Sequence, residues 1–358
     1  MEEILNSQAS TLGINDFLKQ AEKYTKNVFP DVDVSELFAS SFTGNIDNIF
    51  KFSDFGNLFL KEINSALNIL ASVLIIIIIH SIFKAIIENL GNTSSSQIAY
   101  FIQYLAIVTI IINSFVSILD ITKDSINEII NFMNMLVPIF VTLMITTGNL
   151  VTTNITQPIL IFLINFIGNF VNVFLMPMLL ISITLSIISN ISDKVQIDRL
   201  SKFFKSSIIW ILGIILTVFT CVLSIEGTLS CSVDGLTSKT AKAAVSNFIP
   251  VVGKIMGDTV ETVIGCANIL KNSVGIIGVI IIIGISLIPV IKISILWFAF
   301  NITSSICEIV ADVKIVKLLG NIADSYKILL AILISVSIMF IIGITIVIKI
   351  TNSSLMFR

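Results

Sequence analysis

Ionisable side chains inside long apolar runs are the residues of this chain that could do chemistry. Lys292 has roughly eighteen apolar-rich residues on either side. If those residues form one helix, Lys292 is buried and needs a carboxylate or carbonyl partner. If they form a hairpin, Lys292 reaches the lipid headgroups. Glu226, at the end of another apolar run, is a candidate partner for Lys292, and an interfacial position is its alternative.

A second group of ionisable residues follows the first apolar run. His80, Lys84 and Glu88 are spaced four apart, so they share one face of a helix. This face could carry a proton or ion relay, because ionisable groups at membrane depth usually have a role. The alternative is that the three side chains reach the membrane surface from the end of the helix.

The motifs of common enzymes and metal sites do not occur in this sequence. It contains no HExxH, no GxSxG and no Walker motif, and its single histidine excludes a site with several histidine ligands. Its four cysteines, Cys221, Cys231, Cys266 and Cys307, show no CxxC spacing, so we interpret them as packing residues. We therefore expect no catalytic, cofactor-binding or metal-binding residue.

One polar stretch interrupts the longest charge-free part of the chain. Residues 146–158, TTGNLVTTNITQP, include Asn149 and Asn154 and end in Pro158. We expect a non-helical break between two spans, packed inside the bundle or facing a water-filled cavity, because unpaired backbone is not tolerated against lipid. A plain short loop outside the membrane is the alternative. Asn149 and Asn154 are the candidate functional positions of this stretch.

The composition places these residues in a membrane protein. Of 358 residues, 55% are hydrophobic and only 12% are charged, against about a quarter in soluble proteins. The net charge of −2 gives no basic field for nucleic acid, so we expect the lipid bilayer as a partner and no nucleic acid. The fold class is all-α, a polytopic helix bundle.

Apolar runs of bilayer length predict about seven spans. The count becomes about eight or nine if the runs 159–191 and 274–310 are hairpins rather than single kinked helices. The expected spans are 63–83, 98–119, one on each side of the 146–158 break, 206–225, 274–290 with its continuation to 310, and 328–348.

The chain divides into two parts. Residues 1–62 form an amphipathic N-terminal segment without the pattern of a signal peptide, and residues 63–358 form the multi-span domain. Within that domain we predict amphipathic interfacial helices near 120–134 and 251–272, the latter exposing Lys254, Asp258 and Glu261. A basic cluster at 194–205 predicts a cytoplasmic loop.

Gly253 and Gly257 form a GxxxG pair in the second interfacial helix. Glycines at this spacing let another helix approach closely, so we interpret them as helix-packing positions. The alternative is the ordinary glycine richness of membrane helices.

Several motifs of this chain resemble one known family. They are NFIPVVG, DTV, CANILKNSVGIIG and IPVIKI between residues 247 and 293, with VTTNITQPIL, DGLTSKTAK and a closing SLMFR outside that region. Together they resemble the stage III sporulation protein AE family, in order, over roughly residues 60–358. Family members often begin with a signal peptide, and this chain departs from that pattern.

The resemblance implies a non-enzymatic subunit of a secretion-like channel complex. Such a complex spans the envelope between mother cell and forespore, in the mother-cell membrane around the forespore. The partners it implies are other membrane proteins of the stage III sporulation A operon, ring-forming subunits and an ATPase. A self-contained permease for a small solute is the alternative, since broken helices and polar segments at membrane depth are what transporters use. An intramembrane enzyme has no constellation to support it.

Overall fold

The computed structural model describes most of the chain as helix. The described residues are 14–26, 34–43, 52–89, 93–191, 197–248, 252–309 and 311–356. Within them, the elements in chain order are α2 (Ile14–Thr25), α3 (Val34–Thr43), α4 (Phe52–Asn89), α5 (Thr93–Thr146), α6 (Leu150–Phe170), the π-helical segment η1 (Val171–Leu175), α7 (Met176–Ile191), α8 (Asp198–Phe248), α9 (Val252–Cys307) and α10 (Val313–Met356). The all-α fold class is therefore confirmed, and the described residues contain no strand.

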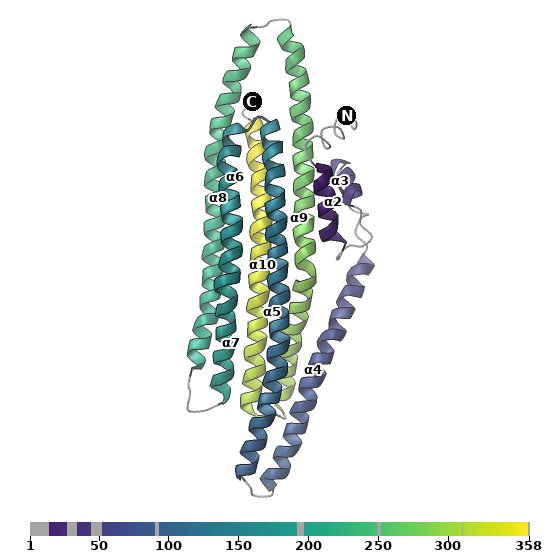
Figure 1. The fold of residues 1–358 in the computed structure, drawn as a ribbon, viewed down its shortest axis with the longest axis vertical. Helices are drawn as coiled ribbons and strands as arrows, with labels where there is room; N and C mark the ends of the chain where they lie inside the picture. Colours follow the sequence, from purple (N-terminus) through teal and green to yellow (C-terminus); the bar gives the residue numbers. More distant parts are fainter. Residues whose placement is uncertain are drawn as a thin grey trace.

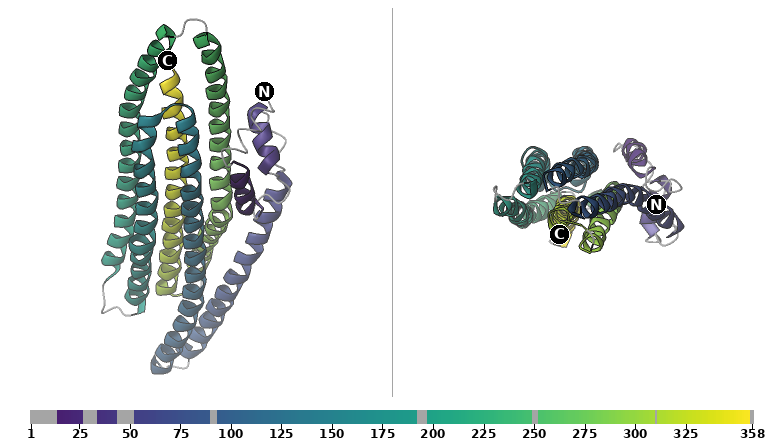
Figure 2. Two further views of the ribbon diagram at one scale, coloured as in Figure 1. Left: turned by 45° about the horizontal axis from the view of Figure 1, so that its top comes forward. Right: turned by 90° about the horizontal axis from the view of Figure 1, so that it is seen from below.

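The long helices run side by side as one tall bundle (Figure 1). α10 lies in its middle and packs most extensively on α9 and α8. α4 runs along one edge of the bundle, beside α9 and α5, and the far ends of α8 and α9 extend beyond the turn that joins α5 to α6. Seen along its long axis the bundle is flattened, with the N-terminal elements at one end (Figure 2).

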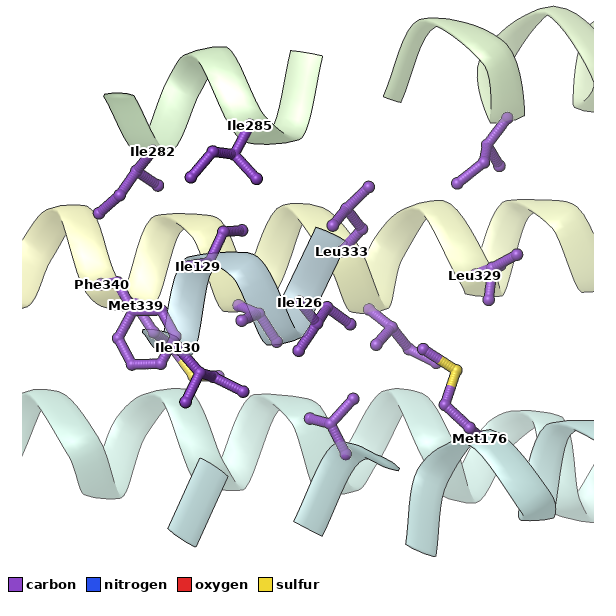
Figure 3. Close-up of a cluster of buried hydrophobic side chains, with 14 of the residues drawn as sticks. Ile126, Ile129, Ile130, Met176, Ile282, Ile285, Leu329, Leu333, Met339 and Phe340 are labelled. Atoms are coloured by element: carbon purple, nitrogen blue, oxygen red, sulfur yellow. The ribbon is translucent and has the colours of Figure 1, made fainter. Parts of the chain in front are cut away.

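The core is a continuous column of branched apolar side chains. Figure 3 shows Ile126, Ile129 and Ile130 of α5 meeting Ile282 and Ile285 of α9 and the central helix α10. Each long helix turns an apolar stripe to its neighbours and also leaves large apolar side chains exposed, which is typical of helices in lipid rather than in water.

The N-terminal amphipathic helix packs on this same column. α2 buries Ile14, Phe17 and Leu18, and the ring of Phe17 lies 6.2 Å from that of Phe132 on α5. Tyr24 contacts Phe132 edge to face, and burial, followed by the nearby Glu128 carboxylate, raises the pKa of its phenol. The apolar face of α2 therefore rests on the bundle of its own chain.

Contacts between neighbouring helices fix their relative heights. Gly168 of α6 faces Ile130 of α5, and Gly343 of α10 faces Phe219 of α8. Gly278 of α9 faces both Leu136 of α5 and Ile344 of α10. In this register five segments without any Asp, Glu, Lys or Arg overlap in height: 129–146, 150–170, 206–225, 272–291 and 328–348. We call them the charge-free layer. At about 1.5 Å per residue each segment is roughly 30 Å long, which is the thickness of a bilayer core.

A band of charge closes one side of this layer. Lys292 lies fourteen residues beyond Gly278, and Asp120, Lys123 and Asp124 of α5 reach the same height because α5 runs antiparallel to α9. Glu62 of α4 is ion-paired to Lys292 there. We call these five residues the charged belt. Beyond it, α4 and the first half of α5 present a second apolar surface, with Ile75, Ile78 and Ile102 exposed.

The sequence predicts more separate spans than the structure has long helices. Five described helices are long and apolar enough to cross a membrane, and a shorter apolar stretch covers Leu70–Ile79. The expected spans at 98–119 and after residue 129 are joined in α5, a single helix of 54 residues. The segment 120–134 is accordingly not a separate interfacial helix. Its apolar side chains, among them Ile126 and Ile129, are buried in the bundle core, which holds the helix straight through its charged turns.

The two long apolar runs are single rods rather than hairpins. α6, η1 and α7 continue without a break from Leu150 to Ile191, and Pro177 lies in the first turn of α7 just after the π-helical turn. A π-turn supplies the local irregularity that a proline after it requires. α9 likewise runs from Val252 to Cys307 with Pro289 inside it, so the helix predicted at 251–272 continues directly into a span.

Candidate functional site

Polar side chains gather at the end of the charge-free layer opposite the belt. Glu226 of α8 is buried, and one of its carboxylate oxygens accepts a hydrogen bond from the hydroxyl of Thr156 on α6. Thr156 and Thr152, one helical turn apart on α6, are both buried. A carboxylate held between two spans costs less when a hydroxyl satisfies it.

The turn between α5 and α6 belongs to the same polar end. Gly148 has a φ of 79°, which lets the chain reverse in a few residues. The side-chain amide of Asn149 donates to the Thr147 hydroxyl at 2.9 Å, and the Thr153 hydroxyl donates to the Asn149 carbonyl at 2.6 Å. Asn149 and Thr147 are buried. The turn therefore satisfies its own polar groups with its own side chains.

The polar break is shorter than the sequence predicts. Only residues 147–149 leave the helix, and α6 begins at Leu150 with Pro158 inside it. Threonine and asparagine side chains can bond to backbone within a helix, so this composition does not by itself require a loop. Of the two candidate asparagines, Asn149 is buried in the turn and Asn154 is exposed on α6.

Lys271 of α9 is a buried charge at this height. Its side chain is 0% exposed, and its ammonium donates to the Asn268 side-chain oxygen at 3.2 Å. It lies one turn before Gly275, which faces Ile348 and Phe140, so Lys271 points toward α10 and α5. Sequence reasoning missed it because it lies at the edge of an apolar run. The available signal was that Lys271 lies four residues before Gly275 and therefore on the same face of the helix.

Lys292 has a different partner from the one suggested by sequence. Its ammonium lies 3.7 Å from a carboxylate oxygen of Glu62 on α4, with both side chains only partly exposed. Because α9 is one continuous helix here, Lys292 lies against other helices and needs a carboxylate partner, which Glu62 supplies. Glu226 is not that partner, since it lies at the opposite end of the charge-free layer beside Thr156. The sequence could not indicate Glu62, which precedes Lys292 by most of the chain.

A second buried cation ties α8 to α10. The ammonium of Lys205 donates to the backbone carbonyl of Asn321 at 2.7 Å, and the side chain is buried. In the sequence it is one of several lysines of a basic cluster. Its neighbour Lys202 is exposed and pairs with Asp198 one turn away on α8, as expected of a surface lysine.

Several candidate residues lie outside the described side chains. The surroundings of Gly253 and Gly257, of Lys254, Asp258 and Glu261, and of His80, Lys84 and Glu88 are among them. Their backbone is helical. The helix-packing interpretation of Gly253 and Gly257 stays a prediction. Two later glycines of the same helix, Gly275 and Gly278, do face neighbouring helices closely.

These polar contacts link side chains and carbonyl groups of the bundle. The described residues contain no group of three or more His, Cys, Asp or Glu side chains placed to hold a metal ion. The hydrogen bonds of Glu226, Asn149 and Lys205 each end on a side chain or carbonyl of the bundle itself. What this arrangement can do is fix the registers of α6, α8 and α10.

Comparisons with known proteins point to one family. A family model described as stage III sporulation protein AE matches residues 32–351. The stage III sporulation protein AE of Bacillus subtilis (strain 168) is 30% identical over 290 residues, which cover 81% of this chain and 73% of that protein. No solved structure matches.

Proposed function

The chain belongs to the stage III sporulation protein AE family, and we propose that it is a non-enzymatic subunit of a secretion-like channel complex that links mother cell and forespore. The observation that carries the proposal is the extent of the match, which includes every long helix of the bundle. The relative is named for a stage of sporulation. The coarse conclusion, a membrane protein of sporulation, follows from that name and from the five membrane-length helices.

A scaffold role fits how the polar groups are used. Glu226, Lys205 and Lys292 each contact another helix, so their charges contribute to the positions of α6, α8, α10 and α4. A transporter needs polar groups that exchange partners with a solute. The proposed subunit instead needs a rigid surface to which other proteins attach.

We place this subunit in the mother-cell membrane that surrounds the forespore. Its proposed partners are other membrane proteins of the stage III sporulation A operon, ring-forming subunits and an ATPase. The basic residues on the belt side, including Arg199 and Lys202, favour the cytoplasm for that side.

Copurification from sporulating cells tests the proposal. A tagged chain, solubilised in mild detergent at the engulfment stage, should bring down other membrane subunits of the complex together with the ATPase. The same tagged chain expressed in vegetative cells is the control, because it should be recovered without them. Recovery of the chain alone from sporulating cells contradicts the proposal.

Liposomes that contain only this chain test the permease alternative. The proposal expects no uptake of ions, amino acids or sugars above the rate of empty liposomes. Saturable uptake that Glu226→Gln abolishes would favour a self-contained permease, because the buried polar end would then handle a solute.

A further inference from the structure

Six asparagines form a polar stripe on the outer side of α5 and α6. On each helix they recur at the same spacing, four and then three residues, so each set shares one helix face. Four of the six side chains are exposed and two are half-buried. We call them the asparagine stripe: Asn127, Asn131 and Asn134 of α5, Asn165 and Asn169 of α6, and Asn172 of η1.

Hydrogen bonds between the two helices align the stripe. The side-chain amide of Asn172 donates to the side-chain oxygen of Asn127 at 2.7 Å. Asn134 and Asn165 lie side by side, with amide nitrogen to oxygen distances of 3.3 and 3.4 Å. An asparagine amide carries two donor hydrogens and an oxygen with two lone pairs, so these contacts leave part of the hydrogen-bonding capacity of the stripe unused.

The other two asparagines lie between these pairs. Gly168 of α6 faces Ile130 of α5, and the next residue of each helix, Asn169 and Asn131, belongs to the stripe. Both of these side chains are exposed. The outer surface of the two helices is therefore an uninterrupted row of amides over this height.

The stripe enters the charge-free layer from the belt side. Asn134 lies six residues beyond Glu128, the last charged residue of α5 before the layer, which is about 9 Å along the helix. On the other helix, no charged residue occurs from Leu150 to Ile191, the range that contains Asn165. Hydrocarbon offers no hydrogen-bond partner, so amides exposed at this depth need water or another protein surface.

The row of amides does not continue across the whole layer. Beyond Asn134 and Asn165 the exposed residues of the same side are mainly apolar: Pro138, Ile145, Pro158 and Ile161. Two exposed polar residues remain there, Thr142, whose hydroxyl donates to the carbonyl of Pro138, and Asn154 near the turn. A water-filled path needs a polar lining from end to end, so a row of this length fits a contact with another protein surface better.

A second copy of this chain has the chemistry that the stripe needs. All copies cross the membrane in one direction, so a two-fold axis along the membrane normal places each residue at the height of its own counterpart. An amide both donates and accepts, so asparagine bonds to asparagine, whereas a lysine or a carboxylate would repel its counterpart. We propose that two copies pair through the asparagine stripe, with α5 and α6 of one against α5 and α6 of the other. The inference rests on the depth of the stripe and is independent of the proposed function.

An aromatic row borders the stripe on α6 and η1. Its rings stack one helical turn apart, with centroids separated by 5.8, 5.8 and 5.0 Å in chain order: Phe162, Phe166, Phe170 and Phe174. Phe162 and Phe166 are well exposed. In the pair, rings of this size exclude lipid and water from the neighbouring amides, which strengthens hydrogen bonds between the copies.

Energy transfer between copies in vesicles tests the pairing. The full-length chain without its four native cysteines carries Lys327→Cys, at an exposed position of α10, labelled with a donor or an acceptor dye. It is reconstituted in phosphatidylcholine vesicles over a wide range of protein-to-lipid ratios. With the stripe intact, half-maximal energy transfer should occur at a ratio about tenfold lower than with Asn131→Leu and Asn169→Leu together, because several interhelical amide bonds are lost.

Two controls separate pairing from folding. Asn301→Leu, at an exposed asparagine of α9 that bonds to its own helix, should leave energy transfer unchanged. The variant with leucine at 131 and 169 should keep the unfolding midpoint of the unchanged chain in dilute detergent, because both side chains are exposed there.

Opposite charges at one position test the symmetry of the pair. Asn131→Lys chains alone and Asn131→Asp chains alone should each need a protein-to-lipid ratio about tenfold higher for half-maximal energy transfer, because like charges meet across the axis. An equal mixture of the two variants should associate near the ratio of the unchanged chain. Recovery in the mixture also shows that both variants fold.

Three results overturn the proposal. Equal association of the unchanged chain and the leucine variant would place the contact on another surface. Absence of energy transfer at every ratio would mean that the chain does not pair and that a different protein covers the stripe. Equal association of the lysine and aspartate variants, alone and mixed, would contradict a two-fold contact at Asn131.

Discussion

The hydroxyl of Thr156 on α6 donates a hydrogen bond to the buried carboxylate of Glu226 on α8, seventy positions later in the chain. The two residues join two spans at the end of the charge-free layer. Neither residue type is unusual at its place in the sequence, and only the packing of α6 against α8 brings them together. The bond connects the first part of α6 with the end of the α8 span.

Removing the donor of this bond should destabilise the bundle. Thr156→Val keeps the shape of the side chain but removes the hydroxyl, so the Glu226 carboxylate loses a bond in a buried setting. We expect a loss of about 1–3 kcal/mol in unfolding free energy. Unfolding of the protein in detergent, followed by circular dichroism, measures it. Thr345→Val is the control, because that threonine is exposed and bonds only to its own helix. An equal effect of both changes would contradict the assignment.

The two asparagines of the polar stretch should respond differently. Asn149→Leu removes the donor to the Thr147 hydroxyl inside a buried turn, so we expect reduced stability and reduced spore formation. Asn154 is exposed on α6, and Asn154→Leu should leave both near the wild-type level. Counts of heat-resistant spores and the cellular level of each variant measure the difference. Loss of sporulation with Asn154→Leu at a normal protein level would point instead to a partner contact at that face.

Two glycines offer a matched test of helix packing. A Cβ atom added at Gly275 would collide with the side chain of Ile348 and approach Phe140, whereas nothing lies within 4 Å of a Cβ atom added at Gly213. Gly275→Leu should therefore lower the unfolding midpoint strongly, because overpacking costs about 1–3 kcal/mol or more. Gly213→Leu should change it little. Thermal unfolding in detergent compares them, and a larger loss for Gly213→Leu would contradict the helix register.

The buried Lys205 of α8 should contribute more to the free energy of unfolding than its exposed neighbour Lys202. Lys205→Met removes the bond to the Asn321 carbonyl and leaves that acceptor without its cation, for an expected loss of about 1–3 kcal/mol. Lys202→Met removes only a surface pair with Asp198, which is worth at most about 1 kcal/mol. Denaturant titration of both variants in detergent separates the effects. Equal losses would mean that Lys205 is not bonded to α10.

The sequence predicts which segments are apolar better than it predicts where each helix ends. Long runs without charge predict a helical membrane bundle, because a helix pairs its backbone N–H and C=O groups within one segment, as lipid requires. The four charged residues around Asp120–Glu128 suggest the end of a span, yet α5 continues through them because Ile126 and Ile129 are buried on its other face. A periodic pattern gives the face of a helix, but not whether the helix stops.

The partners of the buried charges could not be predicted for a related reason. Lys292 is recognisable from its isolation among apolar residues, and one-helix burial predicts a carboxylate near it. Which carboxylate depends on the packing of α4 against α9, and Glu62 lies in a region that the sequence assigns to the N-terminal segment. Lys205 and Lys271 lie next to polar residues, so local polarity does not distinguish them from surface lysines, although both are inside the bundle.

The common height of the five charge-free segments is tested most directly by cysteine accessibility. In a variant without Cys221, Cys231, Cys266 and Cys307, single cysteines replace exposed residues of the layer, Val218, Ile283 or Ile338, and exposed residues near the belt, Asp124, Lys202 or Lys327. A membrane-impermeant maleimide applied to inverted vesicles should label the three positions near the belt, and in intact protoplasts it should label none of them. The three positions of the layer should stay unlabelled in both preparations. Two results would contradict a single bilayer across the layer. One is that a cysteine at Val218, Ile283 or Ile338 is labelled as fast as the cysteines near the belt. The other is that the three positions near the belt are labelled from opposite sides of the membrane.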